Sequence, residues 1–184
     1  MTDEIKQHNF NLYIKKLNQI GVDTSKLVEN LGEKLKNGSF STSISTNLCG
    51  EGTLIDTVLK KLTPFAVRIN GLLDDEKKVD QNSLVKVCLL HHIAKAIEYI
   101  PTNEEWLKKK GYMYEYYKPK PAIKTGLYSL VLCQENGITF TPFEAEAMTI
   151  NDRRTDDEQA NFFSSKLSEI VKMANTLTYI SSKN

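Results

Sequence analysis

The 184-residue sequence lacks any apolar run close to the roughly 20 residues that cross a membrane, so no span is expected. Its first ten residues, MTDEIKQHNF, are polar and lack the apolar core of a secretory signal. The chain also lacks an excess of one charge, because 24 Lys and Arg residues face 23 Asp and Glu residues, a net charge of +1. Without a global electrostatic field, tight non-specific binding to nucleic acid is not expected.

Cysteine is scarce, and Cys49, Cys88 and Cys133 show no CxxC spacing. Cys88 and Cys133 lie in apolar contexts, which predicts small core residues in a reducing compartment. We therefore expect a cytoplasmic protein, whether the cytoplasm is bacterial, eukaryotic or that of an infected cell. The sequence also contains no glycine-rich phosphate loop and no Ser/His/Asp or Cys/His pattern that would support nucleophilic catalysis.

Helical spacing of apolar residues is the main feature that is present. The apolar fraction of 40% and the charged fraction of 26% are ordinary for a globular protein, and the length fits one core. The pattern predicts an all-α fold with a small β-hairpin or extended excursion around 111–121. The expected helices cover about 5–20, 25–35, 54–73 with a kink or a new start at Pro64, 83–100, a short one around Trp106, 127–135, 142–150 and 163–177. Residues 38–52 are expected to form a loop and 74–80 a solvated turn. We expect residues 1–37 to form an N-terminal helical pair packed on a unit of residues 38–184.

Local signals predict where some helices start and stop. Thr102 with Glu105, and Thr141 with Glu144 around a proline, have the spacing of capping boxes. Asn37–Gly38 is typical of a left-handed helix end.

The most unusual stretch is residues 83–100, SLVKVCLLHHIAKAIEYI, where apolar residues occupy most of a helical circumference. His91 and His92 lie inside it, and buried imidazoles need partners. These two residues are expected to be either ligands or the remains of ligands.

Five segments occur in an order that carries a family resemblance. They are EGTLIDTV at 51–58, LLHHIAK at 89–95, the Trp-bearing aromatic stretch, IKTGLYS at 123–129 and AMTIND at 147–152, with Ala174–Asn175 in the last helix. This order resembles the small HD-domain proteins of bacteria and their phages, which are all-helical metal-dependent phosphohydrolases and their relatives. The corresponding family patterns are EGGLxxHS, LLHDxxK, LGHGxxS, AIxxHD and an alanine–aspartate pair. The resemblance covers about residues 38–180 and rests on segment order and hydrophobic spacing.

The resemblance implies a degenerate metal site. Such a centre combines imidazole and carboxylate ligands with an open coordination position, and this chain has only three histidines, His8, His91 and His92. Of the family's site residues, His91 is kept. The positions where a donor is replaced are Thr57, His92, Thr125, Asn151 and Asn175. Neutral Asn and Thr side chains can hydrogen-bond to imidazoles where carboxylates without a metal would repel one another. We therefore expect a polar core cluster, with no catalytic residue, metal or other cofactor.

Two alternatives keep the site functional. An active nucleotide phosphohydrolase would use Mn or Mg held by His91, His92 and a carboxylate from an unexpected position, namely Asp56, Asp80 or Asp152. A nucleotide sensor would instead use Lys95, which stands where the family often places a phosphate-contacting lysine, together with the aromatic excursion. A solvated or pocket-rim lysine is the simpler interpretation of Lys95.

The excursion interleaves lysines with aromatic residues, a pattern found both in nucleic-acid sites and in protein interfaces. Because the net charge is balanced, a protein interface is favoured, through Trp106, Tyr112, Tyr114, Tyr116 and Tyr117. Arg153–Arg154 beside two aspartates is expected to be a mutually screened loop, with an anion site as the alternative.

These observations lead to one hypothesis: a catalytically inactive HD-like domain that acts as a structural or protein-binding module. The resemblance is closest to phage-borne members, which points to a phage-encoded or virion-associated component. Expected partners are proteins or further copies of the chain. A nucleotide is the alternative, and nucleic acid and membranes are not expected.

Overall fold

The computed structural model describes residues 1–117, 122–152 and 164–183, and within them the chain is mostly helical with one small antiparallel sheet. The expected all-α fold with a small β excursion is confirmed. The elements are α1 Asp3–Gln19, α2 Ser25–Asn37, α3 Thr53–Thr57, the π-helix η1 Val58–Leu62, α4 Thr63–Gly71, the 3₁₀ turn η2 Asp75–Lys77, α5 Gln81–Leu90, α6 Lys95–Glu98, β1 Tyr99–Pro101, α7 Glu105–Lys109, β2 Tyr114–Tyr116, α8 Thr125–Glu135, α9 Pro142–Thr149 and α11 Lys166–Ile180. None of the described helices is long and apolar enough to cross a membrane.

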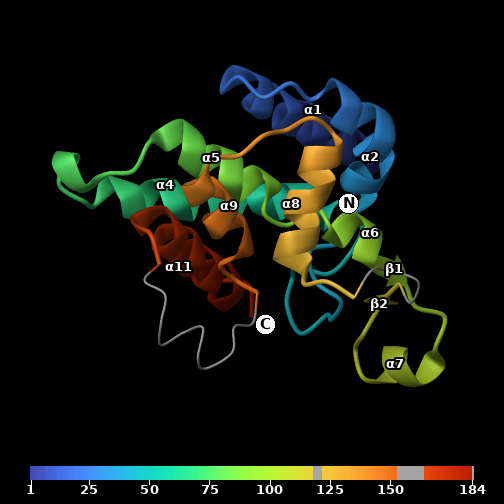
Figure 1. Cartoon of the computed structure of the whole chain (residues 1–184). Helices are drawn as coiled ribbons and strands as arrows, with labels where there is room; N and C mark the ends of the chain where they lie inside the picture. Colours follow the sequence, from blue (N-terminus) through green and yellow to red (C-terminus); the bar gives the residue numbers. More distant parts are fainter. Residues whose placement is uncertain (118–121, 153–163, 184) are drawn as a thin grey trace.

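Helix α5 lies at the centre of the fold and contacts α1, α4, α8, α9 and α11 (Figure 1). Leu84, Val87, Cys88, Leu89 and Leu90 are all buried in the core cluster, which explains why this helix is apolar around most of its circumference. Its start is defined by Asp80, whose carboxylate accepts a hydrogen bond from the Ser83 N–H.

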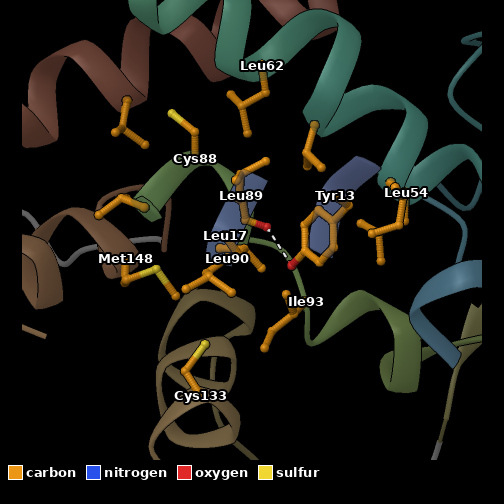
Figure 2. Close-up of a cluster of buried hydrophobic side chains, with 14 of the residues drawn as sticks. Tyr13, Leu17, Leu54, Leu62, Cys88, Leu89, Leu90, Ile93, Cys133 and Met148 are labelled. Carbon is orange, nitrogen blue, oxygen red and sulfur yellow. Dashed lines mark hydrogen bonds between the residues drawn. The ribbon is translucent and has the colours of Figure 1, made fainter. Parts of the chain in front are cut away.

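The N-terminal helices enter the same core. Tyr13 of α1 is fully buried, and its hydroxyl donates to the carbonyl of Leu89 on α5 at 3.1 Å (Figure 2). Figure 2 also shows Cys88 and Cys133 among apolar side chains, and both thiols are free and buried, as expected for core cysteines. Since Tyr13 satisfies a carbonyl in the last turn of α5, α1 is bound to the centre by a directional contact as well as by apolar area.

The helix expected over 83–100 is wrong in its second half, because α5 ends at Leu90. The His91 N–H still bonds four residues back to Val87, but the N–H groups of Ile93 and Lys95 bond three residues back, and the Ala94 N–H donates to the Ser129 hydroxyl at 3.1 Å. This i→i−3 pattern is a 3₁₀-like turn, which is tighter than an α-helix. The turn at 91–94 therefore separates α5 from the short α6.

Two other sequence expectations meet different outcomes around α2–α4. Gly38 has φ −61°, so it is not a left-handed helix end; a Cβ there would lie 2.9 Å from the Leu54 side chain, so close packing explains the glycine. The new helix start expected at Pro64 is confirmed, because α4 begins at Thr63 and has the proline in its first turn. It directly follows the π-helical turn η1, in which the Thr63 N–H bonds to the Val58 carbonyl.

The β excursion differs in its pairing from the expected hairpin. β2 lies within 111–121, but its partner β1 precedes that segment, and α7 lies between them. The capping box at Thr102 is wrong: the Thr102 hydroxyl accepts from the Glu104 N–H, and its own N–H donates to the Met113 carbonyl and prolongs the sheet. The box at Thr141 and Glu144 is confirmed in both of its hydrogen bonds.

Candidate functional site

The two adjacent imidazoles touch each other inside the protein. His91 is 1% exposed and His92 6%, and their ring centroids are 4.3 Å apart. In a regular helix, consecutive side chains point about 100° apart; here both residues lie in the tight turn after α5. The turn is what allows both rings to enter one polar cluster.

Each imidazole bonds to an amide from a different part of the chain. Nδ2 of Asn151, which follows α9, lies 2.7 Å from Nε2 of His91. Oδ1 of Asn175 on α11 lies 2.9 Å from Nε2 of His92. With neutral rings, Asn151 donates to His91 while His92 donates to Asn175. Four of the six residues expected at the degenerate site therefore meet, and they hold together residues from α9, α11 and the α5–α6 turn.

Burial and a neighbouring cation keep both rings uncharged. The pKa of His91 is lowered to about 4, first by burial and then by the nearby Lys95, while the backbone of Met148 partly opposes the shift. The pKa of His92 is lowered by burial, then by Lys95 and His91, and Asn175 opposes that shift. With Nε2 of His91 accepting from Asn151, the neutral ring carries its proton on Nδ1, which is buried without a well-formed hydrogen bond. A second proton, on Nε2, would face the amide donor of Asn151 and place an unsatisfied charge in the core.

Lys95 is not the solvated or rim lysine expected from the sequence, because it is 3% exposed. Its Nζ donates to the Phe40 carbonyl at 2.9 Å and to the Tyr179 hydroxyl at 3.0 Å, and it lies 3.7 Å from the centre of the Phe40 ring. Burial lowers its pKa to about 7, and Glu98 opposes the shift. Phe40 also packs edge-on against His92 at 4.8 Å, so Lys95 and the imidazole pair share one aromatic neighbour.

Thr125 and Thr57 are not bonded to the imidazoles. The Thr125 hydroxyl donates to the buried carboxylate of Glu98 at 2.7 Å. Thr57 is buried in α3, and no hydrogen bond between described residues joins its side chain to His91 or His92. The cluster thus contains the two amides expected at the site but neither threonine.

The carboxylates that a metal would need are engaged elsewhere. Asp152 accepts from the N–H groups of Gly126 and Leu127 at 2.8 and 3.0 Å and so caps α8. Asp80 caps α5, and Asp56 accepts from Asn9 at 2.9 Å and pairs with a lysine. In the described ranges, no group of three or more His, Cys, Asp or Glu side chains could hold a metal ion. The donors present, two imidazoles facing neutral amides, do not fit the imidazole–carboxylate set of a hydrolytic metal centre.

The aromatic residues of the excursion are mostly exposed. Trp106 is 55% exposed, Tyr112, Tyr116 and Tyr117 are between 41% and 50% exposed, but Tyr114 is 9% exposed and is excluded from a free surface. Arg153–Arg154 lie outside the described residues.

Sequence reasoning missed Phe40, Glu98, Ser129 and Tyr179 as members of the polar centre. A lone aromatic residue within the Ser/Thr-rich loop was the available signal for Phe40, and a glutamate inside an apolar stretch was the signal for Glu98. Ser129 and Tyr179 carry no local signal, since their partners are more than thirty residues away.

Comparison with known proteins adds no constraint: no family model, curated protein or solved structure matches this chain. The site is therefore defined by its geometry, as a buried, uncharged imidazole pair closed by two asparagines in a mostly helical protein.

Proposed function

We propose that this protein is a catalytically inactive HD-like domain that works as a structural or protein-binding module, encoded by a phage or carried in a virion. The observation that carries the proposal is the pairing of His91 with Asn151 and of His92 with Asn175. Each amide is hydrogen-bonded to Nε2 of its imidazole, and Nε2 is one of the two ring nitrogens through which a histidine can bind a metal.

Three features support a structural role for this cluster. The histidines are held neutral by burial, no carboxylate bonds to either ring among the described residues, and the amides come from two other parts of the chain. Buried side-chain hydrogen bonds favour one arrangement of the elements around them, and here both Nε2 atoms are bonded while Nδ1 of His91 is not. The cluster is suited to fixing α11 and the segment after α9 against the α5–α6 turn.

The alternatives receive less support from the same geometry. A nucleotide sensor would need Lys95 to reach a phosphate, but its ammonium group is turned to Phe40 and Tyr179 in the interior. A hydrolase would need a carboxylate near the imidazoles, and Asp56, Asp80 and Asp152 are each committed to other contacts.

The direct test is metal analysis of the purified protein, combined with hydrolysis assays on a nucleotide panel supplemented with Mn²⁺. We expect no stoichiometric metal and no turnover. Stoichiometric metal with turnover that His91→Ala abolishes would overturn the proposal. A nucleotide that raises the melting temperature without being consumed would favour the sensor, since a ligand of the native state stabilises it.

A second test addresses the ancestry. The triple variant Thr57→His, His92→Asp and Asn175→Asp restores imidazole and carboxylate at three positions of the resemblance. We expect the variant to be stabilised by Mn²⁺ in thermal unfolding, while the wild-type protein is not. A folded variant that shows no metal-dependent stabilisation would count against the resemblance to HD domains. It would not change the conclusion from the hydrolysis assays, which test the absence of catalysis independently.

A further inference from the structure

The excursion forms an arm, defined here as residues 99–117, that carries most of the exposed aromatic residues in the described part of the chain. Among the described residues, every exposed tryptophan and tyrosine lies on it: Trp106, Tyr112, Tyr116 and Tyr117. α7 contributes no buried residue, and Figure 1 shows it at the far end of the arm, away from α1, α4 and α11. Grouped exposed aromatic residues mark interaction sites more often than single ones do.

The outer edge of β1 offers no free N–H group to another strand. The register places Ile100 opposite Glu115, and the hydrogen bonds from Thr102 to Met113 and from Tyr117 to Glu98 flank this pair. This spacing makes Ile100 and Glu115 a hydrogen-bonded pair, so the backbone N–H and C=O groups at positions 99 and 101 point away from β2. The Tyr99 N–H donates to the Lys95 carbonyl, and Pro101 has no N–H. A partner strand would find no backbone donor on this edge, which leaves side chains as the main contact groups of the arm.

The outer edge of β2 is also occupied. The Tyr114 N–H donates to the Thr42 carbonyl at 3.3 Å, and Tyr112 forms a bridge with Ser43 of the loop 38–52. The β2 edge of the arm is thus bonded to the loop 38–52, and the β1 edge has no free N–H group. Its aromatic and charged side chains are the groups left to recognise a partner.

Charge is separated along α7 in a way that is complementary to itself. Glu104 and Glu105 lie at its start, and Lys108–Lys110 lie at its end and just beyond. Lys108 pairs with Glu105 at 3.0 Å, and Lys110 lies 5.1 Å from the centre of the Trp106 ring. A two-fold axis across the helix would place the glutamates of one copy beside the lysines of the other, with the Trp106 rings near the axis.

We propose that the arm is a self-association surface, on which a second copy of this chain packs its α7 antiparallel to the first. This inference rests on the protein-binding role proposed above and names the partner. The chain's net charge of +1 gives little repulsion between copies. The arm is smaller than the roughly 20–30 residues per side of a standard interface, so the dimer is weak and reversible.

A nucleic-acid partner fits the same surface less well. Glu104, Glu105 and Glu115 balance Lys108–Lys110 within the described arm, so a polyanion would meet as many carboxylates as ammonium groups. Surfaces that bind single strands combine aromatic residues with a positive groove. The balanced charges favour a protein surface of mixed charge.

The single tryptophan makes the test direct, because Trp106 is the only one in the chain. Sedimentation velocity of the full-length protein should show the 20.9 kDa monomer converting to a dimer as concentration rises. Over the same range, Trp106 emission should shift to the blue and become harder to quench with acrylamide. A monomer at every concentration, or a dimer with unchanged emission, would overturn the proposal, as would quenching by an oligothymidylate without self-association.

Exchanging the charges at the two ends of α7 tests whether association uses this antiparallel arrangement rather than another surface. Glu104→Lys with Glu105→Lys, and Lys108→Glu with Lys109→Glu, should each weaken self-association about tenfold or more, because attractive contacts become repulsive. Mixing the two variants should restore the dimer, and failure to do so with both variants folded would overturn the antiparallel arrangement. Phe143→Ala removes a 66%-exposed aromatic outside the arm and should leave association unchanged. A monomer without turnover would overturn only this inference, and metal-dependent turnover would overturn only the proposed function.

Discussion

Two regions depart from the usual placement of side chains, and they do so in opposite ways: the cluster around His91 and His92 buries polar residues, and the arm at 99–117 exposes aromatic ones. The cluster puts two histidines and a lysine in the core, and the arm puts a tryptophan and three tyrosines in solvent. Buried polar groups and exposed large apolar groups are the informative exceptions to hydrophobic partitioning. The two regions are joined in the chain, since Lys95 and Glu98 lie only a few residues before β1.

The comparison separates two uses of an aromatic side chain. Phe40 is fully buried and contacts His92 and Lys95, so it stabilises the fold. Trp106 is larger but more than half exposed, so folding gains less from it. We infer that the cluster determines the arrangement of the helices and that the arm contributes to association, and the following changes test this division.

The largest expected effect is that of Phe40→Ala. It removes a fully buried ring, its edge contact with His92 and its contact with Lys95, and should lower the free energy of unfolding by about 3–5 kcal/mol. Trp106→Ala is the matched control and should change it by about 0.5 kcal/mol or less. Urea denaturation of both variants gives the comparison; equal losses would contradict the division between cluster and arm.

The next effect is an acid dependence that comes from the cluster. His91 has a folded pKa near 4, below its ordinary value of 6.5, so the unfolded chain binds the proton more readily. Stability is then fully present above pH 6.5 and is lost as the pH falls toward 4, by roughly 3 kcal/mol from this group. The pH dependence of the free energy of unfolding across this window should become less steep in His91→Gln, and His92, whose pKa burial also lowers, should supply the slope that remains. His8→Gln, which removes an exposed imidazole, is the control and should keep the wild-type slope. An unchanged slope in His91→Gln would show that His91 does not contribute to the acid dependence.

A smaller effect is expected from one amide. Asn175→Leu keeps a similar volume but leaves the Nε2–H of His92 without its acceptor, which should lower stability by about 1 kcal/mol because Asn175 is half-buried. Thr176→Leu, on the exposed side of the same helix, is the control and should have little effect. Thermal unfolding of the two variants measures the difference, and a neutral Asn175→Leu would mean that water replaces the amide.

Much of the fold could be predicted because its signals are local. The helix periodicities, the solvated turn at 74–80 and the capping box of Thr141 all depend on residues within a few positions of one another. The end of α5 at Leu90 could not be predicted in this way. The N–H of Ala94 is taken by Ser129 and the rings of His91 and His92 by distant asparagines, so tertiary contacts end a helix that local propensity would continue.

The candidate site could be predicted in part, because the family resemblance aligns positions that are far apart in the sequence. Asn151 and Asn175 meet the imidazoles, although they lie 60 and 83 residues along the chain from them. The expectation for Lys95 was wrong, because lysine is usually exposed and only the position of Phe40 and Tyr179 shows that this one is buried. The pairing of β1 with β2 was missed because α7 separates the two strands in sequence.

The smallest effect on stability is expected at the edge of the arm, in Pro101→Val. The substitution supplies an outward N–H that β1 lacks, and it should change the free energy of unfolding by about 1 kcal/mol or less, mainly through the unfolded chain. It should nevertheless promote open-ended association, because proline on an edge strand blocks the pairing of strands from different molecules. Light scattering and thioflavin fluorescence over time measure this growth, and Ile100→Val, which adds no N–H, is the control. If Pro101→Val solutions stay as clear as those of the control, then Pro101 is not the residue that blocks pairing at this edge. If the variant aggregates while its stability is unchanged, then Pro101 serves to prevent unwanted strand pairing rather than to stabilise the fold.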